Sequence, residues 1–283
     1  MQRWSTYELI FFDCDSTIST IEGIDELARM KGKELRVGLL TQKAMDGELD
    51  LEVVYGKRLQ AINPTRSQME AIKEMYAQTL VPDAAEVIQA LQYLKKHVYI
   101  ISGGLLDAVQ GFGERLGVPK ENIRAVELEY NTLSGEWWRY YDQQAQRQQK
   151  FMDYEKSPLT VSSGKPKIVR ELAGETWGRR MMVGDGASDL ATRNNGIDLF
   201  IGFGGVVKRE KVEQEADVFL YANTLAPILP MASGAYGLEV LRNTPHEKVF
   251  KKGLDIAFTA NQIRFREEEL KAAFLGEFEN RDL

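Results

Sequence analysis

The stretch Leu9-Ile10-Phe11-Phe12-Asp13-Cys14-Asp15-Ser16-Thr17 decides the fold, because a continuous apolar run ends in two carboxylates one residue apart. Such a run is typical of a parallel strand that is buried on both faces. Side chains alternate along a strand, so we expect Asp13 and Asp15 to point to the same side beyond its end. The two carboxylates could share a divalent cation, or act as nucleophile and proton donor.

Two later apolar runs also end in polar residues. Val98–Ile101 is followed by Ser102-Gly103-Gly104, and Met181–Val183 is followed by Gly184-Asp185-Gly186-Ala187-Ser188-Asp189. Lys165 lies between the two runs, at the predicted start of a helix. The sequence therefore repeats one arrangement, in which a buried strand carries acidic or hydroxyl groups at its carboxyl end.

The carboxyl ends of parallel strands converge on one crevice in an open α/β sheet. We therefore predict an α/β fold, with a Rossmann-like open parallel sheet and helices on both faces. The side chains expected at the crevice are Asp13, Asp15, Ser102 and Asp185. Each of them alone could belong to a solvated turn, but the agreement of several strand ends favours a functional site.

Apolar residues recur at helical spacing after the first strand, which predicts a small helical cap over the crevice. The recurring positions are Ile21, Ile24, Leu27 and Ala28, then Leu35, Leu39 and Leu40, then Leu51, Val54, Leu59 and Ile62. We expect residues 1–18 and 83–235 to form the catalytic core, residues 19–82 the cap, and residues 236–283 a helical C-terminal extension. A cap of this kind would exclude water from the crevice.

Four ordered motifs resemble those of the haloacid dehalogenase superfamily of phosphatases, over roughly residues 9–229. They are Asp13-Cys14-Asp15-Ser16-Thr17, Ser102-Gly103-Gly104, Lys165 and Gly184-Asp185-Gly186-Ala187-Ser188-Asp189. Within that superfamily, the cap is similar to the serine-recognition elements of the phosphoserine phosphatase family. The similar elements are Glu22-Gly23-Ile24-Asp25-Glu26-Leu27-Ala28, and Ala44-Met45-Asp46-Gly47 with Lys57-Arg58.

The resemblance implies hydrolysis of a phosphomonoester through an aspartyl phosphate. Asp13 would attack phosphorus, and Asp15 would protonate the leaving oxygen and then activate water. Mg²⁺ would be held by the carboxylates of Asp13 and Asp185 and by the backbone carbonyl of Asp15. The Asp15 role requires a pKa above the usual range of an aspartate.

The resemblance also implies which groups contact the phosphate. Lys165 would be the third catalytic residue and would add positive charge there. The Ser102 hydroxyl and the Gly103 backbone N–H would donate hydrogen bonds. Ser188 stands where the family often has Asn or Thr, and its hydroxyl would keep a contact. Asp189 would hold Lys165 or a metal-bound water in place.

The substrate implied is a small phosphorylated metabolite, with O-phosphoserine favoured. Glu22 would face its ammonium group and Arg58 its carboxylate, because the planar guanidinium can pair with a carboxylate through two hydrogen bonds. Met45 and Leu51 would form apolar walls.

Composition narrows the classes of partner. The 283 residues carry 36 Lys and Arg against 42 Asp and Glu, and this net charge of −6 argues against nucleic acid as the ligand. The single cysteine, Cys14, cannot form an internal disulfide and predicts a small buried side chain. No apolar run is long enough to span a membrane, and no signal sequence precedes the first strand, so we expect a cytoplasmic protein.

Two segments lie outside these patterns. Residues 129–159 include Trp137-Trp138-Arg139-Tyr140-Tyr141, and predict an aromatic hairpin that could contact substrate, a partner chain or the core. In the C-terminal extension, Phe250–Phe258 and Ile263–Phe278 have amphipathic character. An extra pair of helices packed on the core is the first interpretation of the extension, and a homodimer contact is the second.

Other classes of function fit parts of the pattern. A receiver-type signalling domain also phosphorylates an Asp at a strand end, but it needs neither a proton donor two residues later nor a cap. A non-catalytic phosphoserine-binding protein would not need an intact nucleophile and acid. A phosphotransferase would pass the aspartyl phosphate to a second hydroxyl, and the substrate could be a sugar phosphate or another phosphorylated acid. The sequence alone does not separate these last alternatives from hydrolysis of phosphoserine.

Overall fold

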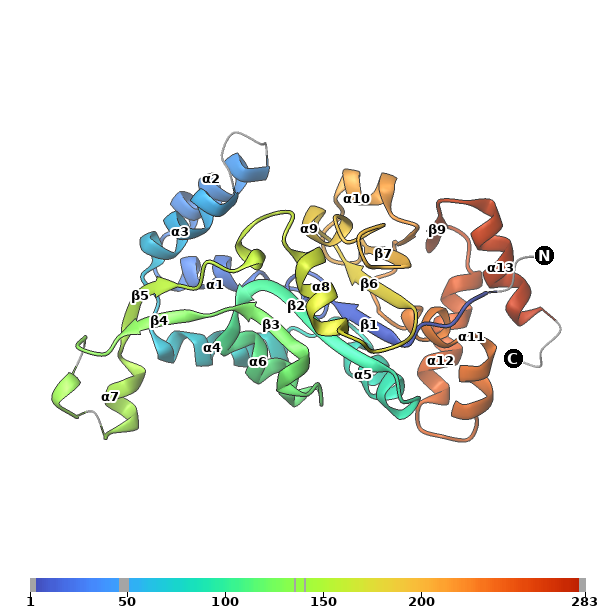
Figure 1. Ribbon diagram of the computed structural model, residues 1–283, viewed down its shortest axis with the longest axis horizontal. Coiled ribbons are helices and arrows are strands. Elements are labelled where there is room, and N and C mark those ends of the chain that lie inside the picture. The colour runs from blue at the N-terminus through green and yellow to red at the C-terminus, as the bar shows by residue number, and fades with distance from the viewer. Residues whose placement is uncertain (1–3, 46–50, 135, 140, 280–283) are drawn as a thin grey trace.

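The computed structural model describes residues 4–45, 51–134, 136–139 and 141–279. At its centre lies a seven-stranded sheet in the order β3-β2-β1-β6-β7-β8-β9 (Figure 1). Its strands are β1 Leu9–Phe12, β2 His97–Leu105, β3 Ile123–Val126, β6 Arg180–Gly184, β7 Leu199–Phe203, β8 Val218–Leu220 and β9 Ile263–Phe265. Neighbouring strands are parallel except for β8 and β9, which are antiparallel. The predicted α/β class with an open, mostly parallel sheet is confirmed.

Strand β1 lies in the interior of this sheet, between β2 and β6, and all four of its residues are buried, as the apolar run predicts. Phe12 aligns with Ile100 on β2 and with Val183 on β6. The polar groups near the ends of these three strands therefore meet at one edge of the sheet. Strand β2 continues through Ser102-Gly103-Gly104 with a shift of register against β3, so this motif lies in the irregular end of the strand.

Helices pack around the sheet and cover its apolar side chains (Figure 1). They are α5 Ala84–Tyr93, α6 Leu106–Arg115, α8 Lys165–Ala173, α9 Ala187–Leu190, α10 Glu210–Glu215 and α11 Ile228–Leu241, with the 3-10 turns η1 Lys120–Asn122 and η3 Pro158–Thr160. Of the helices that the structure describes, none is both long and apolar enough to cross a membrane.

Four helices lie in the segment predicted as the cap. They are α1 Gly23–Met30, α2 Glu34–Met45, α3 Leu51–Ile62 and α4 Arg66–Gln78. Helices α1 and α3 bury predicted positions such as Leu27 and Leu59, but the predicted apolar face of α2 is wrong: Leu35 and Leu39 are exposed and Val37 is buried. Helix α2 lies at the outer side of the molecule, so little of its surface can be covered (Figure 1). The division into a core and a cap at residues 18 and 82 stays a prediction.

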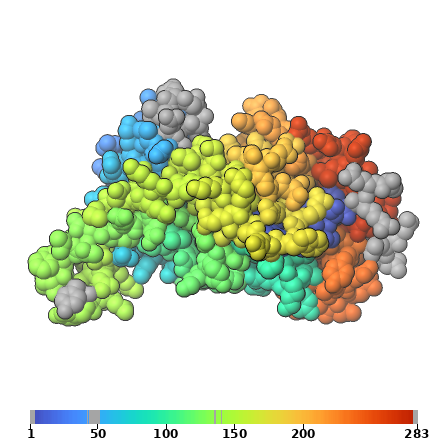
Figure 2. Space-filling view, viewed as in Figure 1, coloured from blue at the N-terminus to red at the C-terminus, as the bar shows by residue number. Residues whose placement is uncertain are grey.

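The segment 129–159 contains the predicted hairpin, which extends away from the main sheet as a protrusion (Figures 1 and 2). Strand β4 (Leu128–Asn131) pairs antiparallel with β5 (Lys150–Tyr154), and η2 (Trp137–Arg139) and α7 (Gln143–Arg147) lie between them. Trp137, Trp138 and Tyr141 are exposed, so these three aromatic residues do not belong to the core.

The C-terminal extension is helical except for one strand. Helices α12 (Glu247–Phe258) and α13 (Glu268–Phe278) form as expected, whereas β9 joins the edge of the sheet beside β8. The prediction of helical character from Ile263 onward is wrong at its start, because three residues are too few to show a strand period. Helix α11 continues through the predicted boundary at residue 236, with a kink at Gly234, whose φ is +57°.

An aromatic cluster holds the extension to the N-terminal segment. The Trp4 ring packs edge-on against Phe274 at 4.9 Å between centroids, and its indole N–H donates to the Met231 carbonyl at 2.9 Å. Phe274 is fully buried and also contacts Phe265 of β9 and Phe278. The extension therefore shares the hydrophobic core of the sheet.

We expect Phe274→Ala to lower the free energy of unfolding by about 3 to 5 kcal/mol, because it leaves a cavity among these rings. Urea denaturation followed by circular dichroism measures this loss. The matched control is Phe258→Ala, since Phe258 is a partly exposed phenylalanine at the end of α12. Equal losses in the two variants would contradict a shared core.

Candidate active site

Three carboxylates meet where β1 and β6 end. One oxygen atom from each of Asp13, Asp185 and Asp189 lies within 4.8 Å of the others, and all three residues are buried. Burial raises the pKa of Asp185 to about 7 and that of Asp189 to about 8, and the charge of Asp13 adds to both shifts. For Asp185 and Asp189, burial and the neighbouring negative charge outweigh the nearby cations that would lower the pKa.

The oxygen donors in this cluster fit a hard divalent cation such as Mg²⁺. Asp13 Oδ1 is buried and accepts no hydrogen bond of good geometry from any residue that the structure describes, although the Lys165 ammonium lies 2.8 Å away. Asp189 joins Asp13 and Asp185 as a third carboxylate, whereas the sequence predicted it only as a supporting residue. The cluster contains side-chain oxygens of Asp13 and Asp185, as expected, but not the side chain of Asp15.

Lys165 brings positive charge into the cluster from the first residue of α8. Its ammonium lies 2.8 Å from Asp13 Oδ1 and 2.5 Å from Asp189 Oδ1. Burial alone would lower the pKa of Lys165, but the two carboxylates outweigh it and raise the pKa above its usual value. A Cβ atom at Gly164 would lie 1.6 Å from the Pro158 carbonyl oxygen, so glycine is required for the chain to enter α8 here.

The carboxyl group of Asp15 lies among three donors. Its Oδ1 accepts from the Gly23 backbone N–H at 2.9 Å and from the Tyr76 hydroxyl at 2.6 Å, and its Oδ2 lies 3.4 Å from the Ser102 hydroxyl. Burial, with the charge of Glu22 nearby, raises the pKa of Asp15 to about 8, although the Tyr76 hydrogen bond opposes the shift. A carboxyl group with this pKa carries a proton at neutral pH, as a general acid must.

The motif Ser102-Gly103-Gly104 faces both Asp15 and the cap. The Gly104 backbone N–H donates to the Ser102 hydroxyl oxygen at 2.9 Å, and the Gly103 carbonyl accepts from the Tyr55 hydroxyl of α3 at 2.9 Å. A Cβ atom at Gly104 would lie 2.9 Å from Asp15 Oδ2. Glycine at this position therefore allows the strand end to approach the carboxyl group.

The sequence does not predict Arg209, which lies just before α10 in the connection after β7. Its Nε lies 2.9 Å from Asp185 Oδ2, and its Nη2 lies 3.4 Å from Glu22 Oε1. Glu22 also accepts from the Ser16 hydroxyl at 2.9 Å, and burial raises the pKa of Glu22. The position of Arg209 after a parallel strand is the sequence signal that could have identified it, because that connection leaves the edge of the sheet where Asp185 lies.

The other predicted substrate residues are more dispersed. Arg58 lies on α3, where its Nη1 donates to the Thr41 hydroxyl at 3.3 Å and its guanidinium lies 5.6 Å from the centre of the Tyr55 ring. Its Nε is buried and has no hydrogen-bond partner among the described residues. Ser188 is half-buried in the first turn of α9. The expected contacts of Met45 and Leu51 fall on side chains outside the described part.

Two further hydroxyl groups reach the site, one from Thr17 in the first motif and one from Tyr76, which has no evident sequence signal. Tyr76 of α4 is fully buried and donates to Asp15, and the Thr17 hydroxyl lies 3.4 Å from Asp185 Oδ1. The expectation that Cys14 is a small buried side chain is confirmed, and burial raises the pKa of its thiol well above the usual range. The thiol therefore stays protonated beside the acidic cluster.

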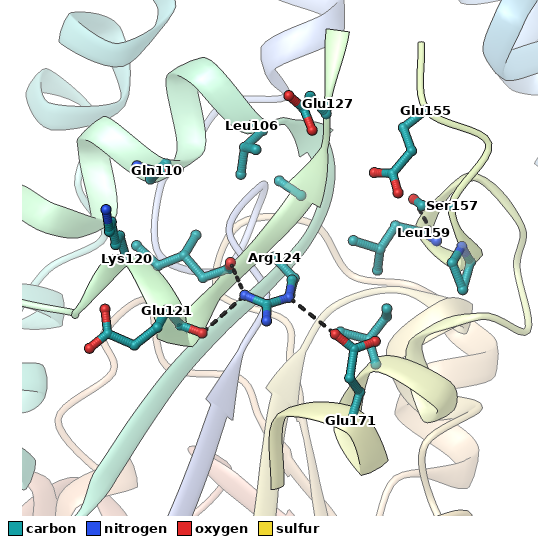
Figure 3. A pocket seen from close by; sticks show the side chains of 14 residues that line it. Leu106, Gln110, Lys120, Glu121, Arg124, Glu127, Glu155, Ser157, Leu159 and Glu171 are labelled. Atoms are coloured by element: carbon teal, nitrogen blue, oxygen red, sulfur yellow. Dashed lines mark hydrogen bonds and ion pairs between the residues drawn. The ribbon is translucent and has the colours of Figure 1, made fainter. Parts of the chain in front are cut away.

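A separate pocket of about 440 Å³ lies among β3, α6 and η3 (Figure 3). In it, Arg124 donates to the carbonyl groups of Glu121 and Ile123 and pairs with Glu171 at 3.5 Å. None of the described residues that line this pocket is a predicted site residue. The pocket is therefore distinct from the cluster around Asp13.

Comparison with known proteins gives one consistent family. The model of the haloacid dehalogenase-like hydrolase family matches residues 7–195. The chloroplastic phosphoserine phosphatase of Arabidopsis thaliana is 34% identical over 223 residues, which are 78% of this chain and 71% of that protein. The phosphoserine phosphatase of Mus musculus is 32% identical over 214 residues, 75% of this chain and 88% of that protein. A solved structure described as a substrate-bound phosphoserine phosphatase complex has a TM-score of 0.64 and 27% identity, and covers 80% of this chain and 98% of its own.

The raised pKa values predict how the stability of the metal-free protein depends on pH. Unfolded aspartates titrate near 3.8, whereas Asp185 and Asp189 titrate at about 7 and about 8 in the folded protein. Between these values the folded protein binds more protons than the unfolded chain, so the free energy of unfolding falls as pH rises. We expect the Tm in the presence of a chelator to be lower by about 2 °C or more at about pH 8.5 than at about pH 6.

We expect Asp185→Asn to weaken this pH dependence, because an amide cannot lose a proton. The control is Glu175→Gln, which removes an exposed carboxylate. We expect the Tm of this variant to depend on pH as it does in the native protein. A Tm that rises with pH in the metal-free native protein would contradict the raised pKa values of Asp185 and Asp189.

Proposed function

Because the chain belongs to the haloacid dehalogenase-like hydrolase family and is a phosphoric monoester hydrolase, we propose that it hydrolyses O-phospho-L-serine to L-serine and phosphate. The names of its relatives support this substrate, since the similarity to two phosphoserine phosphatases extends over about three quarters of the chain. A solved structure that resembles the chain carries the same name with substrate bound.

The proposal rests on two residues of opposite charge in the segment predicted as the cap, Glu22 and Arg58. Glu22 precedes α1 and reaches Arg209 at the edge of the sheet, so it could face an ammonium group beside the phosphate. Arg58 has a buried Nε that no described group accepts from, and a substrate carboxylate would supply an acceptor. An amino acid carries both of the charges that these residues complement.

The reaction would proceed in two displacements. A carboxylate oxygen of Asp13 attacks phosphorus, the bond from phosphorus to the serine oxygen breaks, and the proton of Asp15 passes to that oxygen. Asp15, now ionised, takes a proton from water, whose oxygen attacks the phosphorus of the aspartyl phosphate. This second step releases phosphate and restores the Asp13 carboxylate and the Asp15 carboxyl group.

The remaining site residues would bind the phosphoryl group during both steps. Lys165, which is already paired with Asp13, would attract the phosphate oxygens. The Ser102 hydroxyl, the Gly103 backbone N–H and the Ser188 hydroxyl would donate hydrogen bonds to them. Such donors are most effective in a site from which water is excluded.

Mg²⁺ would be held by the carboxylates of Asp13 and Asp185 and the backbone carbonyl of Asp15, with Asp189 adjoining. When bound, the ion neutralises negative charge on the phosphoryl oxygens. Arg209 contacts the Asp185 carboxylate in this structure. The guanidinium of Arg209 would therefore have to move if the Asp185 side chain rotated to bind a cation.

We expect Asp13→Asn to lower kcat by at least about 10⁴-fold, because an amide is too weak a nucleophile to form the acyl phosphate. Phosphate release with Mg²⁺ measures turnover, and circular dichroism checks that the fold is intact. The control is Asp255→Asn, at an exposed carboxylate on α12 where we expect native turnover. Substantial turnover by Asp13→Asn would exclude the covalent route.

We expect Arg58→Ala to lower kcat/KM for O-phosphoserine by roughly 100-fold, mainly through KM, since a charge-assisted pair to the substrate carboxylate is lost. The neighbouring Lys57→Ala is the matched control, because Lys57 is exposed on the same helix. Activity of the native protein is compared over O-phosphoserine, sugar phosphates and phosphoglycerate-like acids. A clear preference for sugar phosphates would contradict the serine proposal and leave the chemistry of Asp13 untouched.

A further inference from the structure

We propose that Tyr55 and Tyr154 are positioning residues for phosphoryl transfer, through which the β4–β5 hairpin controls the Ser102-Gly103-Gly104 motif. Tyr154 on the hairpin holds the Tyr55 ring, and the Tyr55 hydroxyl orients the peptide unit between Gly103 and Gly104. The proposal rests on the proposed contact of Ser102 and Gly103 with the phosphate, and does not depend on which alcohol leaves.

A chain of hydrogen bonds leads from Tyr55 to Asp15. The Tyr55 hydroxyl donates to the Gly103 carbonyl at 2.9 Å, and the N–H of that same peptide unit, on Gly104, donates to the Ser102 hydroxyl oxygen at 2.9 Å. The Ser102 hydroxyl in turn lies 3.4 Å from Asp15 Oδ2. Because the peptide is planar, a bond at its carbonyl also fixes the direction of its N–H. Tyr55 thereby aims the Ser102 hydroxyl, and hydrogen bonds in series strengthen one another.

The Tyr55 ring is held in place by contacts with Tyr154 and Arg58. It is buried, with the Tyr154 ring centred 5.3 Å away and the Arg58 guanidinium 5.6 Å from its own ring centre. Gly56 allows Tyr154 to come so close, because a Cβ atom at Gly56 would lie 2.9 Å from the Tyr154 hydroxyl oxygen. A glycine inside a helix costs about 1 kcal/mol relative to alanine. The close packing of Tyr154 against Gly56 explains why a glycine stands at this position of the helix.

The hairpin that carries Tyr154 is attached to the start of α4 and, through Tyr130, to α6. Near the start of α4, the Phe151 backbone N–H donates to the Pro64 carbonyl at 2.8 Å, and the Arg66 side chain donates to Gln149 at 3.0 Å. The Arg66 guanidinium also lies over the Tyr130 ring, 4.1 Å from its centre. Tyr130 in turn donates to Asp107, in the first turn of α6, at 2.8 Å.

Through these contacts, the hairpin connects the helices that carry Tyr55 and Arg66 to α6. Strand β5 lies beside α3 (Figure 1), and the hairpin ties α3 and the start of α4 to α6. Helix α6 directly follows the end of β2 that carries Ser102. The hairpin therefore sets the distance between Tyr55 and the Gly103 carbonyl, on which the alignment of Ser102 depends.

The test compares kcat and KM for two substrates, O-phosphoserine and p-nitrophenyl phosphate, in the 283-residue protein with Mg²⁺. We expect Tyr55→Phe to lower kcat about 10-fold for both substrates, because the Gly103 carbonyl loses the hydrogen bond that orients its peptide unit. We expect KM to change less than about twofold. We expect a similar loss for Tyr154→Leu. Tyr154→Phe should stay within about twofold of the native kcat, because the ring contact with Tyr55 is retained.

Two glycine-to-alanine variants distinguish the positioning role of Tyr154 from a general effect on stability. We expect Gly56→Ala to lower kcat, because the new methyl group displaces Tyr154, although alanine favours the helix. The control is Gly38→Ala on α2, where a Cβ atom would meet nothing within 4 Å, and where we expect native kcat. A purely structural role predicts that both variants keep native kcat and an equal or higher Tm.

The double variant Tyr55→Phe/Tyr154→Leu should be no slower than Tyr55→Phe, because Tyr154 acts through the Tyr55 hydroxyl. Native kcat in Tyr55→Phe, equal kcat in Gly56→Ala and Gly38→Ala, or fully additive losses in the double variant would each overturn the proposal. If the native protein hydrolyses p-nitrophenyl phosphate but not O-phosphoserine, the serine assignment fails. The ratios of variant to native kcat on p-nitrophenyl phosphate then still decide the role of the two tyrosines.

Discussion

The constraint on which this structure depends is the burial of several carboxyl groups at one edge of an apolar sheet. Asp13, Asp185 and Asp189 lie within a few ångströms of one another, and the carboxyl group of Asp15 is half-buried at the end of the same strand. The Lys165 ammonium and the Arg209 guanidinium bring positive charge to this cluster, each contacting a different part of it. An uncompensated buried carboxylate is costly, and here the cost is expressed as raised pKa values. The same desolvation makes each charge more effective toward a phosphoryl group.

The order of the strands produces this crowding. Because β1 lies between β2 and β6 and runs parallel to both, the ends of three strands that are distant in sequence open on one edge. Close packing there requires small residues. Gly164 lets the chain turn into α8 beneath Lys165, and Gly104 lets the end of β2 approach Asp15. The reactive groups thus stand on rigid elements, which keeps their relative positions accurate.

Elements outside the central sheet contribute hydroxyl groups to the site. Tyr76 of α4 and Tyr55 of α3 donate to Asp15 and to Gly103, so two buried phenols from one inserted segment meet the strand ends. The hairpin packs Tyr154 against the second of these phenols. Groups that contact Asp15 and Gly103 therefore come also from parts of the chain outside the four motifs at the sheet edge.

The sequence by itself determined the parallel sheet and the residues at its strand ends, because an apolar run followed by Asp, Ser-Gly-Gly or Gly-Asp-Gly is a local pattern. Asp13, Ser102 and Asp185 could be predicted for that reason, and Lys165 through the helix that it begins. Only the tertiary structure decided that Arg209 reaches Asp185, that Tyr76 and Tyr55 enter the site, that β9 forms an edge of the sheet and that Leu35 and Leu39 stay exposed. These features depend on which distant segments pack together. The position of Arg209 after a parallel strand indicates only the edge of the sheet that it reaches, and a tyrosine on a helix or a three-residue strand has no period or spacing that would reveal its partner.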